Sequence, residues 1–353
     1  MKMANERVRR KIKLCSIGKI RVQLLWYCFK VAKVRCFLLK LVALLLVFLL
    51  FDSGFFLVYS LHASSQKIGH EASCYSLVAR VSLQDENGFL VVPVAINGYD
   101  THMILDTGAE GSLLSPTASL LFETSRETSR WTVMRGTGGI GNIAPNVRVM
   151  SLRIGFAQFG PLSMPVASLP VVLTPRVAGL IGGDLLSRYD VELDVSEQTM
   201  ALWHMHSNCK REHAAPVGWR YIYRAVPLTI TAQHRAFVKV ILDGHPLLAL
   251  LDTGARARVL SKKATLRIGV STQALSADKG GVTQGVDAHK RPYHWHQFHF
   301  FQIGQEIEPH PTLTVASLQD TADILLGAEW FARHRVWISY QTKTLYIMPI
   351  AQR

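Results

Sequence analysis

The sequence predicts a mainly β protein made of two similar lobes, with one transmembrane helix before them. Three observations lead to this prediction: a repeat with constant spacing, turn signals between alternating apolar segments in each copy, and a long apolar run near the N-terminus of the 353-residue chain. Hydrophobic residues make up 49% of the chain and charged residues 18%. This composition allows a buried core and is not typical of a disordered protein.

The repeat is clearest at Asp-Thr-Gly-Ala, which occurs at 106–109 and again, 146 residues later, at 252–255. The turn pairs Asn97-Gly98 and Asp243-Gly244 keep the same offset. Asn-Gly and Asp-Gly between alternating apolar segments are strong signals for β-hairpins. Each copy therefore predicts a strand, a tight turn, a second strand and then the Asp-Thr-Gly-Ala loop.

Two further pieces repeat in the same order. Glycine-rich stretches follow at 135–142 and 279–285, and an apolar pair with glycine follows in "LIGG" (180–183) and "LLGA" (325–328). A short helical segment and two alternating strands are expected after each pair. Similarity at a fixed period indicates a tandem duplication. We assign the first lobe to residues 81–203, a linker to residues 204–222 and the second lobe to residues 223–353.

The N-terminal part predicts a membrane anchor. Residues 1–36 form a basic, cytoplasmic segment, residues 37–61 are almost all apolar and long enough to cross a bilayer, and residues 62–80 form a tether. The charge asymmetry places the N-terminus in the cytoplasm and the lobes across the inner membrane, in the periplasm or outside the cell. A cleaved signal peptide is the alternative, against which the length of the basic segment argues.

The net charge of +14 does not indicate a nucleic-acid partner. Residues 1–62 hold twelve basic and two acidic residues, so the lobes carry little excess charge for a DNA-binding face. Cys74 and Cys209 are the cysteines beyond the predicted anchor, where oxidation is allowed. We expect a disulfide that ties the ends of the first lobe together; two unrelated thiols are the alternative.

The two Asp-Thr-Gly loops predict a site with two carboxylates. A pseudo-two-fold axis between the lobes would bring Asp106 and Asp252 together, and two carboxyl groups a few ångströms apart tend to share one proton. The ionised group can take a proton from water while the protonated group polarises an amide carbonyl. This chemistry suits hydrolysis of a peptide bond without a covalent intermediate.

These features resemble the retropepsin-like aspartic proteases, in the bacterial membrane-anchored form with two lobes fused in one chain. The resemblance covers roughly residues 85–353 and is carried by "LDTGA" at 105–109 and 251–255, by "LIGG" and "LLGA", and by "HRVWISYQTKTLYI" at 334–347. It implies a membrane-anchored aspartic endopeptidase that acts on a peptide or protein, with no cofactor and no metal. Dimerisation would not be required, because one chain supplies both carboxylates.

The resemblance also implies a role for each site residue. Asp106 and Asp252 would be the catalytic pair, and Thr107 and Thr253 would hydrogen-bond across the two loops. Gly108 and Gly254 would let the loops approach each other, and Gly182 and Gly327 would be structural glycines. The flaps over the substrate would include Gly136, Gly138, Gly139 and Gly141 in the first lobe and Gly280, Gly281 and Gly285 in the second.

The second copy departs from the family pattern after its Asp-Thr-Gly-Ala. Glu110 follows the first copy, whereas Arg256 follows the second, with Arg258 close by. An arginine that reached the pair would favour two ionised carboxylates and weaken the acid role. It would otherwise bind a substrate carboxylate or point to solvent, and we expect the latter. A catalytically inactive module that binds peptides or ligands in the cell envelope is the alternative function.

His294 and His296 raise the question of a metal site. No carboxylate or cysteine is fixed beside them in the sequence. We therefore expect an exposed strand of the second lobe rather than a set of metal ligands.

Overall fold

The computed structural model describes residues 74–136, 139–169, 177–209, 216–219, 223–284 and 290–350. They belong to one unit, which spans His70–Arg353. The predicted basic segment (1–36), transmembrane helix (37–61) and most of the tether (62–80) lie outside the described residues. Within the described ranges, no helix has the length and apolar character needed to span a membrane.

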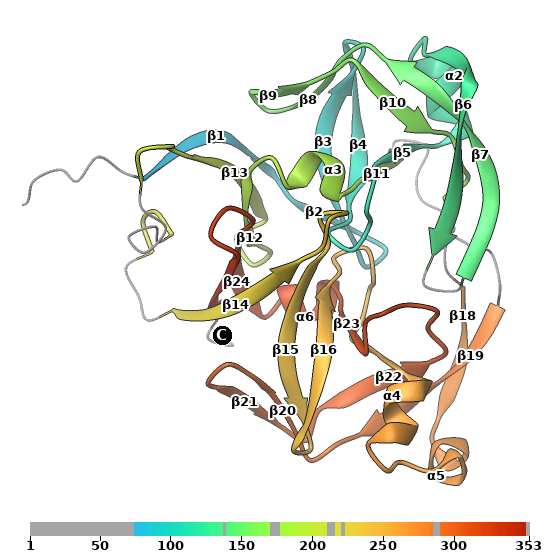
Figure 1. Ribbon diagram of the computed structural model, residues 1–353, viewed down its shortest axis with the longest axis vertical. Coiled ribbons are helices and arrows are strands. Elements are labelled where there is room, and N and C mark those ends of the chain that lie inside the picture. Colours follow the sequence, from blue (N-terminus) through green and yellow to red (C-terminus); the bar gives the residue numbers. More distant parts are fainter. Residues whose placement is uncertain are drawn as a thin grey trace, which may run out of the picture. The chain divides into compact units, whose positions relative to one another are not determined.

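The first lobe contains a seven-stranded sheet and a three-stranded sheet (Figure 1). The larger sheet has the order β5-β11-β4-β3-β8-β9, with β2 paired to β3. The smaller sheet is a long hairpin, β6 and β7, extended by β10. The elements are β2 (Gln84–Glu86), β3 (Phe89–Ile96), β4 (Tyr99–Leu105), β5 (Leu113–Leu114), α2 (Pro116–Leu121), β6 (Ser125–Gly136), β7 (Gly139–Val149), β8 (Leu152–Ile154), β9 (Ala157–Phe159), β10 (Leu162–Pro165), β11 (Val177–Ile181) and α3 (Gly183–Leu186).

The second lobe repeats the main features of this plan. Strands β15 and β16 form the first hairpin, and β23 then pairs in parallel with β16 as β11 does with β4. Strands β18 and β19 form a second hairpin that pairs with β22. The elements are β15 (Ala236–Leu242), β16 (His245–Leu251), β17 (Val259–Ser261), α4 (Lys262–Arg267), α5 (Thr272–Ala277), β18 (Gly280–Gln284), β19 (Lys290–Gln297), β20 (Phe300–Ile303), β21 (Glu306–Pro309), β22 (Thr312–Ala316), β23 (Ile324–Leu326) and α6 (Ala328–Phe331).

The two Asn-Gly and Asp-Gly turns have matching backbones. Asn97 and Asp243 both have a φ of 49°, and Gly98 and Gly244 follow with φ of 93° and 82°. Two successive residues with positive φ are typical of a type I′ turn, whose twist matches that of the flanking strands. The predicted internal repeat and the mainly β, two-lobed fold are thus confirmed.

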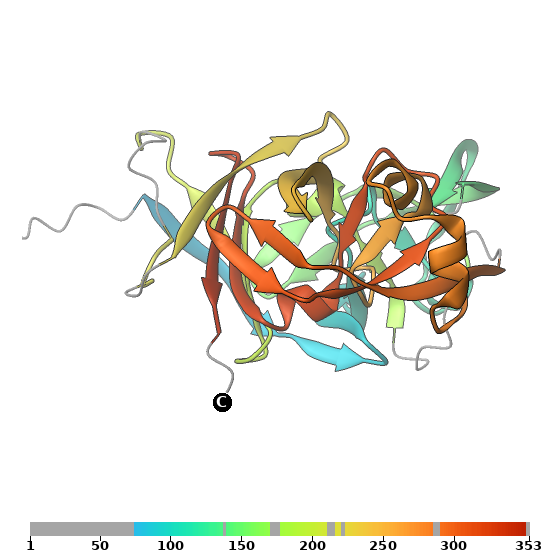
Figure 2. The ribbon, with the colours of Figure 1, turned by 90° about the horizontal axis from the view of Figure 1, so that it is seen from below.

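A sheet of strands from both lobes joins them (Figure 2). Its strands begin in the order β1-β13-β12-β24-β25-β14, and β14 then pairs with β15, so the sheet continues into the second lobe. The lobes meet where β12 pairs antiparallel with β24, from Val191 opposite Ile338 to Asp194 opposite Arg335. The strands are β1 (Tyr75–Ser82), β12 (Asp190–Asp194), β13 (Thr199–Met205), β14 (Arg224–Ile230), β24 (His334–Ser339) and β25 (Thr344–Pro349).

This sheet corrects two predicted boundaries. Strand β1 begins within the segment assigned to the tether, and β13 runs two residues into the segment assigned to the linker. Both extensions arise because β1 and β13 pair along their whole length, from Tyr75 opposite Met205 to Ser82 opposite Thr199. A disulfide joins Cys74 to Cys209 just beyond the paired ends, with the two Cα atoms 5.5 Å apart.

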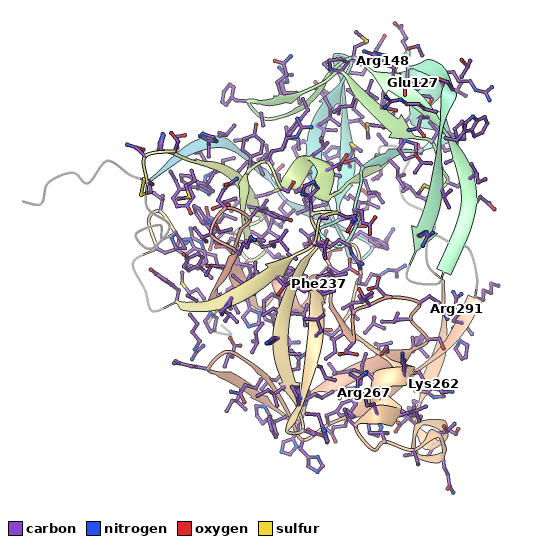
Figure 3. All side chains as sticks on the ribbon, viewed as in Figure 1. Glu127, Arg148, Phe237, Lys262, Arg267 and Arg291 are labelled. Atoms are coloured by element: carbon purple, nitrogen blue, oxygen red, sulfur yellow. A yellow bond between two sulfur atoms is a disulfide. The ribbon has the colours of Figure 1, made fainter. Side chains whose placement is uncertain are left out.

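One cluster of buried apolar side chains includes residues of both lobes. Figure 3 shows how side chains fill the space between the strands. The sheet that joins the lobes also buries Glu192, which accepts hydrogen bonds from the indole N–H groups of Trp203 (2.9 Å) and Trp219 (3.0 Å) and pairs with Arg335. A buried carboxylate is tolerated only with such partners. The lobes are therefore held together by a continuous core and by satisfied polar groups.

Candidate active site

The two Asp-Thr-Gly loops begin where β4 and β16 end. Each strand pairs in parallel with the strand that carries the apolar pair before glycine, β11 or β23. The backbone N–H of Asp106 donates to Ile181 O and that of Asp252 donates to Leu326 O, both at 3.0 Å. The two aspartates thus have equivalent, fixed backbones at the ends of buried strands.

Thr107 and Thr253 connect the loops through four hydrogen bonds. The N–H of Thr107 donates to Thr253 Oγ1 at 3.0 Å, and the N–H of Thr253 donates to Thr107 Oγ1 at 3.1 Å. The hydroxyl of Thr107 donates to Leu251 O at 2.8 Å, and the hydroxyl of Thr253 donates to Leu105 O at 2.6 Å. Both threonines are fully buried, so these contacts fix one loop against the other.

The glycines of the two loops lie against the opposite carboxyl groups. A Cβ atom on Gly108 would lie 2.5 Å from Cγ of Asp252, and one on Gly254 would lie 2.4 Å from Cγ of Asp106. Real Cβ atoms do not approach other atoms so closely, so any side chain would displace a carboxyl group. The structure therefore brings together Asp106, Asp252 and the four loop residues in the arrangement that the sequence predicts.

The carboxyl groups of Asp106 and Asp252 interact with each other but have different surroundings. Removal from water raises the pKa of Asp106, and hydrogen bonds from the N–H groups of Ala109 (2.9 Å) and Gly108 (3.0 Å) oppose that rise. Removal from water and then repulsion by Asp106 raise the pKa of Asp252 well above its usual range. Asp252 accepts a weaker backbone bond from Ala255 (3.1 Å). Asp106 accepts more backbone N–H bonds than Asp252, which favours the ionised form of Asp106.

Comparison with known proteins agrees with this geometry. A family model described as "Aspartyl protease" matches residues 92–185 and 238–330, one segment in each lobe. The chain belongs to the aspartyl protease family. It is also 25% identical over 147 residues to the DNA damage-inducible protein 1 of Kluyveromyces lactis. That match covers 41% of this chain and 34% of the relative, so the chain spans about a third of the length of this relative.

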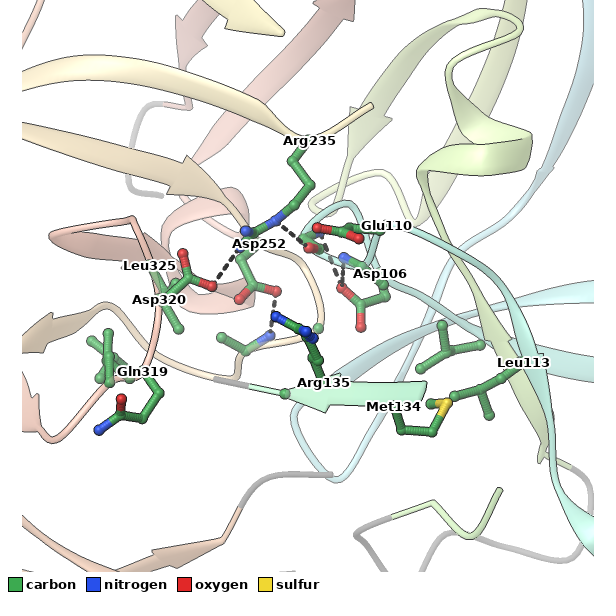
Figure 4. A pocket seen from close by; sticks show the side chains of 18 of the residues that line it. Asp106, Glu110, Leu113, Met134, Arg135, Arg235, Asp252, Gln319, Asp320 and Leu325 are labelled. Atoms are coloured by element: carbon green, nitrogen blue, oxygen red, sulfur yellow. Dashed lines mark hydrogen bonds and ion pairs between the residues drawn. The ribbon is translucent and has the colours of Figure 1, made fainter. Parts of the chain in front are cut away.

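Arg235 is a charged neighbour of the pair that the sequence analysis missed. Its Nε–H donates to Gly108 O at 2.9 Å, and its Nη2 lies 2.7 Å from Oδ2 of Asp320 (Figure 4). Its charge lowers the pKa of both Asp106 and Asp252. The repeat could not reveal it, because the residue 146 positions earlier is Phe89.

The two arginines that the sequence singled out lie elsewhere. The guanidinium carbon of Arg256 lies 4.9 Å from the ring centre of Phe89, and the residue is exposed in the cleft. Arg258 is buried, which corrects the expectation that it points to solvent: it forms ion pairs with Glu308 and Glu329. It is Arg235, therefore, whose charge lowers the pKa of both aspartates.

The flap predicted for the first lobe of this aspartyl protease corresponds to the β6–β7 hairpin. Gly136 pairs with Gly139 beside its turn, and Gly141 lies on β7. Gly138 lies outside the described residues. The described glycines of the predicted flap thus lie on this hairpin, close to its turn.

The predicted second flap is the β18–β19 hairpin, and here the glycines lie differently. Gly280 and Gly281 are at the start of β18, opposite His294 and Tyr293, away from the turn. A Cβ on Gly280 would lie 2.0 Å from Tyr293 O, and one on Gly281 would lie 2.7 Å from the Tyr293 hydroxyl. Both glycines thus belong to the predicted hairpin, and the close approach of β19 explains why they have no side chain. Gly285 lies outside the described residues.

Gly182 and Gly327 pack closely against the segments that follow the two Asp-Thr-Gly sequences. A Cβ on Gly182 would lie 2.6 Å from the carbonyl carbon of Gly111, and one on Gly327 would lie 2.3 Å from Ala257 O. The residues that follow them donate to the loops, Gly183 N–H to Ala109 O at 2.8 Å and Ala328 N–H to Ala255 O at 2.7 Å. Both glycines therefore occupy structural positions of the kind that the sequence predicts.

A cleft of about 1390 Å³ lies between the lobes and includes both aspartates. Both hairpins contribute to its lining, and Val133 on β6, Val282 on β18 and Trp295 on β19 are exposed apolar residues there. Exposed apolar side chains beside a cleft are typical of a surface that closes over a ligand. The cleft thus has room for a peptide segment next to the two carboxyl groups.

No set of three or more His, Cys, Asp or Glu side chains among the described residues is arranged to hold a metal ion. His294 and His296 both lie on β19, and His296 Nδ1 is 2.6 Å from Oδ2 of Asp278.

Proposed function

We propose that the chain is an aspartic endopeptidase in which Asp106 and Asp252 activate water. The observation that carries this proposal is the pair of carboxyl groups on two closely packed loops, which the cross-loop bonds of Thr107 and Thr253 hold together. In this mechanism, ionised Asp106 takes a proton from water as the water oxygen attacks the peptide carbonyl carbon. Protonated Asp252 donates its proton to the carbonyl oxygen. The resulting diol then collapses: Asp106 gives its new proton to the leaving nitrogen as the C–N bond breaks, and Asp252 takes a proton from a hydroxyl of the diol as the product carboxyl group forms.

The lining of the cleft supports cleavage within a chain rather than at an end. Residues of both lobes and both hairpins contribute to it on either side of the aspartates. An extended peptide that passes between the lobes would place one of its internal bonds next to the carboxyl pair. Both carboxyl groups come from one chain, so the proposed activity does not require a dimer.

The test uses the full chain, the variant Asp252→Asn and a mixed peptide library, read by mass spectrometry over a series of acidic to neutral pH values. We expect cuts with the wild type that are absent from the variant. Asp100→Asn is the matched control, because Asp100 is exposed on β4 and lies outside the cleft lining. Peptide binding without cleavage by folded wild-type protein would instead support the catalytically inactive binding module.

We also propose that residues 37–61 anchor the lobes in the inner membrane, with the catalytic part in the periplasm or outside the cell. The apolar run, the basic segment before it and the disulfide between Cys74 and Cys209 support this proposal. Membrane fractions extracted with alkaline carbonate should retain the full chain. Release of the chain into the soluble fraction would contradict the anchor.

A further inference from the structure

Arg256 is a cation in the cleft without a counter-charge among the described residues. It comes four residues after Asp252, is exposed, and contributes to the lining of the cleft. Its contacts are with the turn at Gly88 and the ring of Phe89. An exposed arginine in open solvent would need no explanation, but this one lies beside the loop of a proposed catalytic residue.

On the other side of the pseudo-two-fold axis, the charge of the corresponding arginine is neutralised by an acidic partner. Arg235 occupies the position equivalent to Phe89, and it pairs with Asp320 and with Gly108 O. There the loop residue equivalent to Arg256 is the acidic Glu110. The two ends of the cleft therefore differ: one has a paired arginine next to an acid, and the other has an arginine over an aromatic ring.

The contacts of Arg256 fix its position without using its hydrogen-bond donors. Its Cδ would lie 3.0 Å from a Cβ on Gly88, so the absence of a side chain there gives room for its aliphatic stem. Its guanidinium carbon lies over Phe89, a cation–π arrangement that uses the face of the group. The N–H donors in the plane stay available for a carboxylate, which guanidinium groups bind with two parallel hydrogen bonds.

We propose that Arg256 binds a carboxylate of the substrate at one end of the cleft and so selects peptides that carry an acidic group on that side of the cleaved bond. The carboxylate is either an acidic side chain or the C-terminal carboxylate of the peptide. This inference rests on the proposed peptidase function, because it assigns the charge preference of the same cleft. The pseudo-symmetric end, with Glu110 and the neutralised Arg235, does not bind the acidic group.

The test measures kcat/KM for peptides that share one cleavable core. Each pair differs by Glu or Gln at one position along the peptide, and a second pair ends in a free carboxylate or an amide. Assays at about pH 6 keep the Glu side chain ionised. For the wild type we expect the charged peptide of one pair to be preferred roughly tenfold.

Three variants locate the origin of that preference. Arg256→Gln should reduce the ratio of charged to neutral peptide to about one, and Arg256→Glu should favour a Lys peptide over its Gln counterpart. Arg135→Gln tests a second arginine of the cleft, on β6, and Arg153→Gln tests an exposed arginine on β8 outside the cleft lining. Both of these variants should keep the wild-type ratio. A wild-type ratio in Arg256→Gln, or loss of the ratio in Arg135→Gln, would overturn the proposal.

A binding arm separates this inference from the peptidase proposal. The same peptides, labelled with a fluorophore, are titrated against Asp252→Asn with and without Arg256→Gln. Charge-selective binding that needs Arg256, together with no cleavage by the wild type, would reject the peptidase and support the role of Arg256. Cleavage without charge preference would support the peptidase and reject the role of Arg256. A preference lost on amidation would identify the carboxylate as the C-terminus.

Discussion

Thr107 and Thr253 each donate a backbone N–H to the hydroxyl of the other, at 3.0 and 3.1 Å. Each hydroxyl in turn donates to the strand that precedes the opposite aspartate. The bonds are equivalent under the pseudo-two-fold relation of the lobes, and both residues are fully buried. The position of each carboxyl group therefore depends on the other lobe.

Replacing Thr253 with valine should weaken this connection at nearly constant volume. The change leaves Leu105 O without its donor and the N–H of Thr107 without its acceptor. Two unsatisfied buried groups should lower the free energy of unfolding by roughly 2–6 kcal/mol. Urea unfolding measures this change. Thr253→Ser retains the hydroxyl, so its free energy of unfolding should fall much less. Equal stability of the valine variant and the wild type would contradict the assigned hydrogen bonds.

Gly254→Ala should impair hydrolysis by displacing Asp106. The new Cβ would lie 2.4 Å from the carboxyl carbon, and a displacement of about 1 Å near the reacting atoms can cost roughly a hundredfold in rate. Gly111→Ala is the matched control, since a Cβ there meets no atom within 4 Å. Peptide hydrolysis rates compare the two variants. A Gly254→Ala variant as active as Gly111→Ala would show that the loops can separate at little cost.

Arg235→Gln should move the pH profile of activity to higher pH. The proposed mechanism needs Asp106 ionised and Asp252 protonated, and the charge of Arg235 lowers the pKa of both groups. Without that charge both pKa values rise, so the acidic and alkaline limbs of kcat/KM both shift upwards. Asp320→Asn should act in the opposite sense on the alkaline limb, because Asp320 raises the pKa of Asp252. Unshifted limbs in Arg235→Gln would exclude this role.

Asp252→Asn should be more stable than the wild type at neutral pH. Folding raises the pKa of Asp252 above its ordinary value of 3.8, so the favourable effect of its proton is complete below that value and is lost as pH rises through the folded pKa. Each unit of that rise corresponds to about 1.4 kcal/mol. Asparagine does not titrate, so the advantage of the variant should grow from acidic to neutral pH. Thermal unfolding over a pH series measures it, and a difference that is independent of pH would refute the assignment.

The repeat made the centre of the fold predictable. Asp106, Asp252, their threonines and the Asn97 and Asp243 turns share an offset of 146 residues, and local turn chemistry marks each copy. The sheet that joins the lobes was not predictable in the same way. It pairs Tyr75 with Met205 and Val191 with Ile338, contacts between distant parts of the sequence that no local pattern specifies.

The site was predictable where it follows the repeat and not where the lobes differ. Arg235 has Phe89 as its counterpart, so symmetry gave no signal for it. Gly280 and Gly281 were predicted as flap residues from their spacing, but the close approach of Tyr293, which requires glycine there, has no signal in the sequence. The environment of Arg258 depends on Glu308 and Glu329, which lie far away in the sequence.

The paired role of Asp106 and Asp252 is tested most directly by the rate of peptide hydrolysis by the wild type, Asp106→Asn and Asp252→Asn, measured on protein shown by circular dichroism to be folded. We expect each substitution to lower kcat by roughly a hundredfold to ten-thousandfold, since each removes the acid or the base of one pair. Hydrolysis at the wild-type rate by either variant would contradict a mechanism that depends on both carboxyl groups.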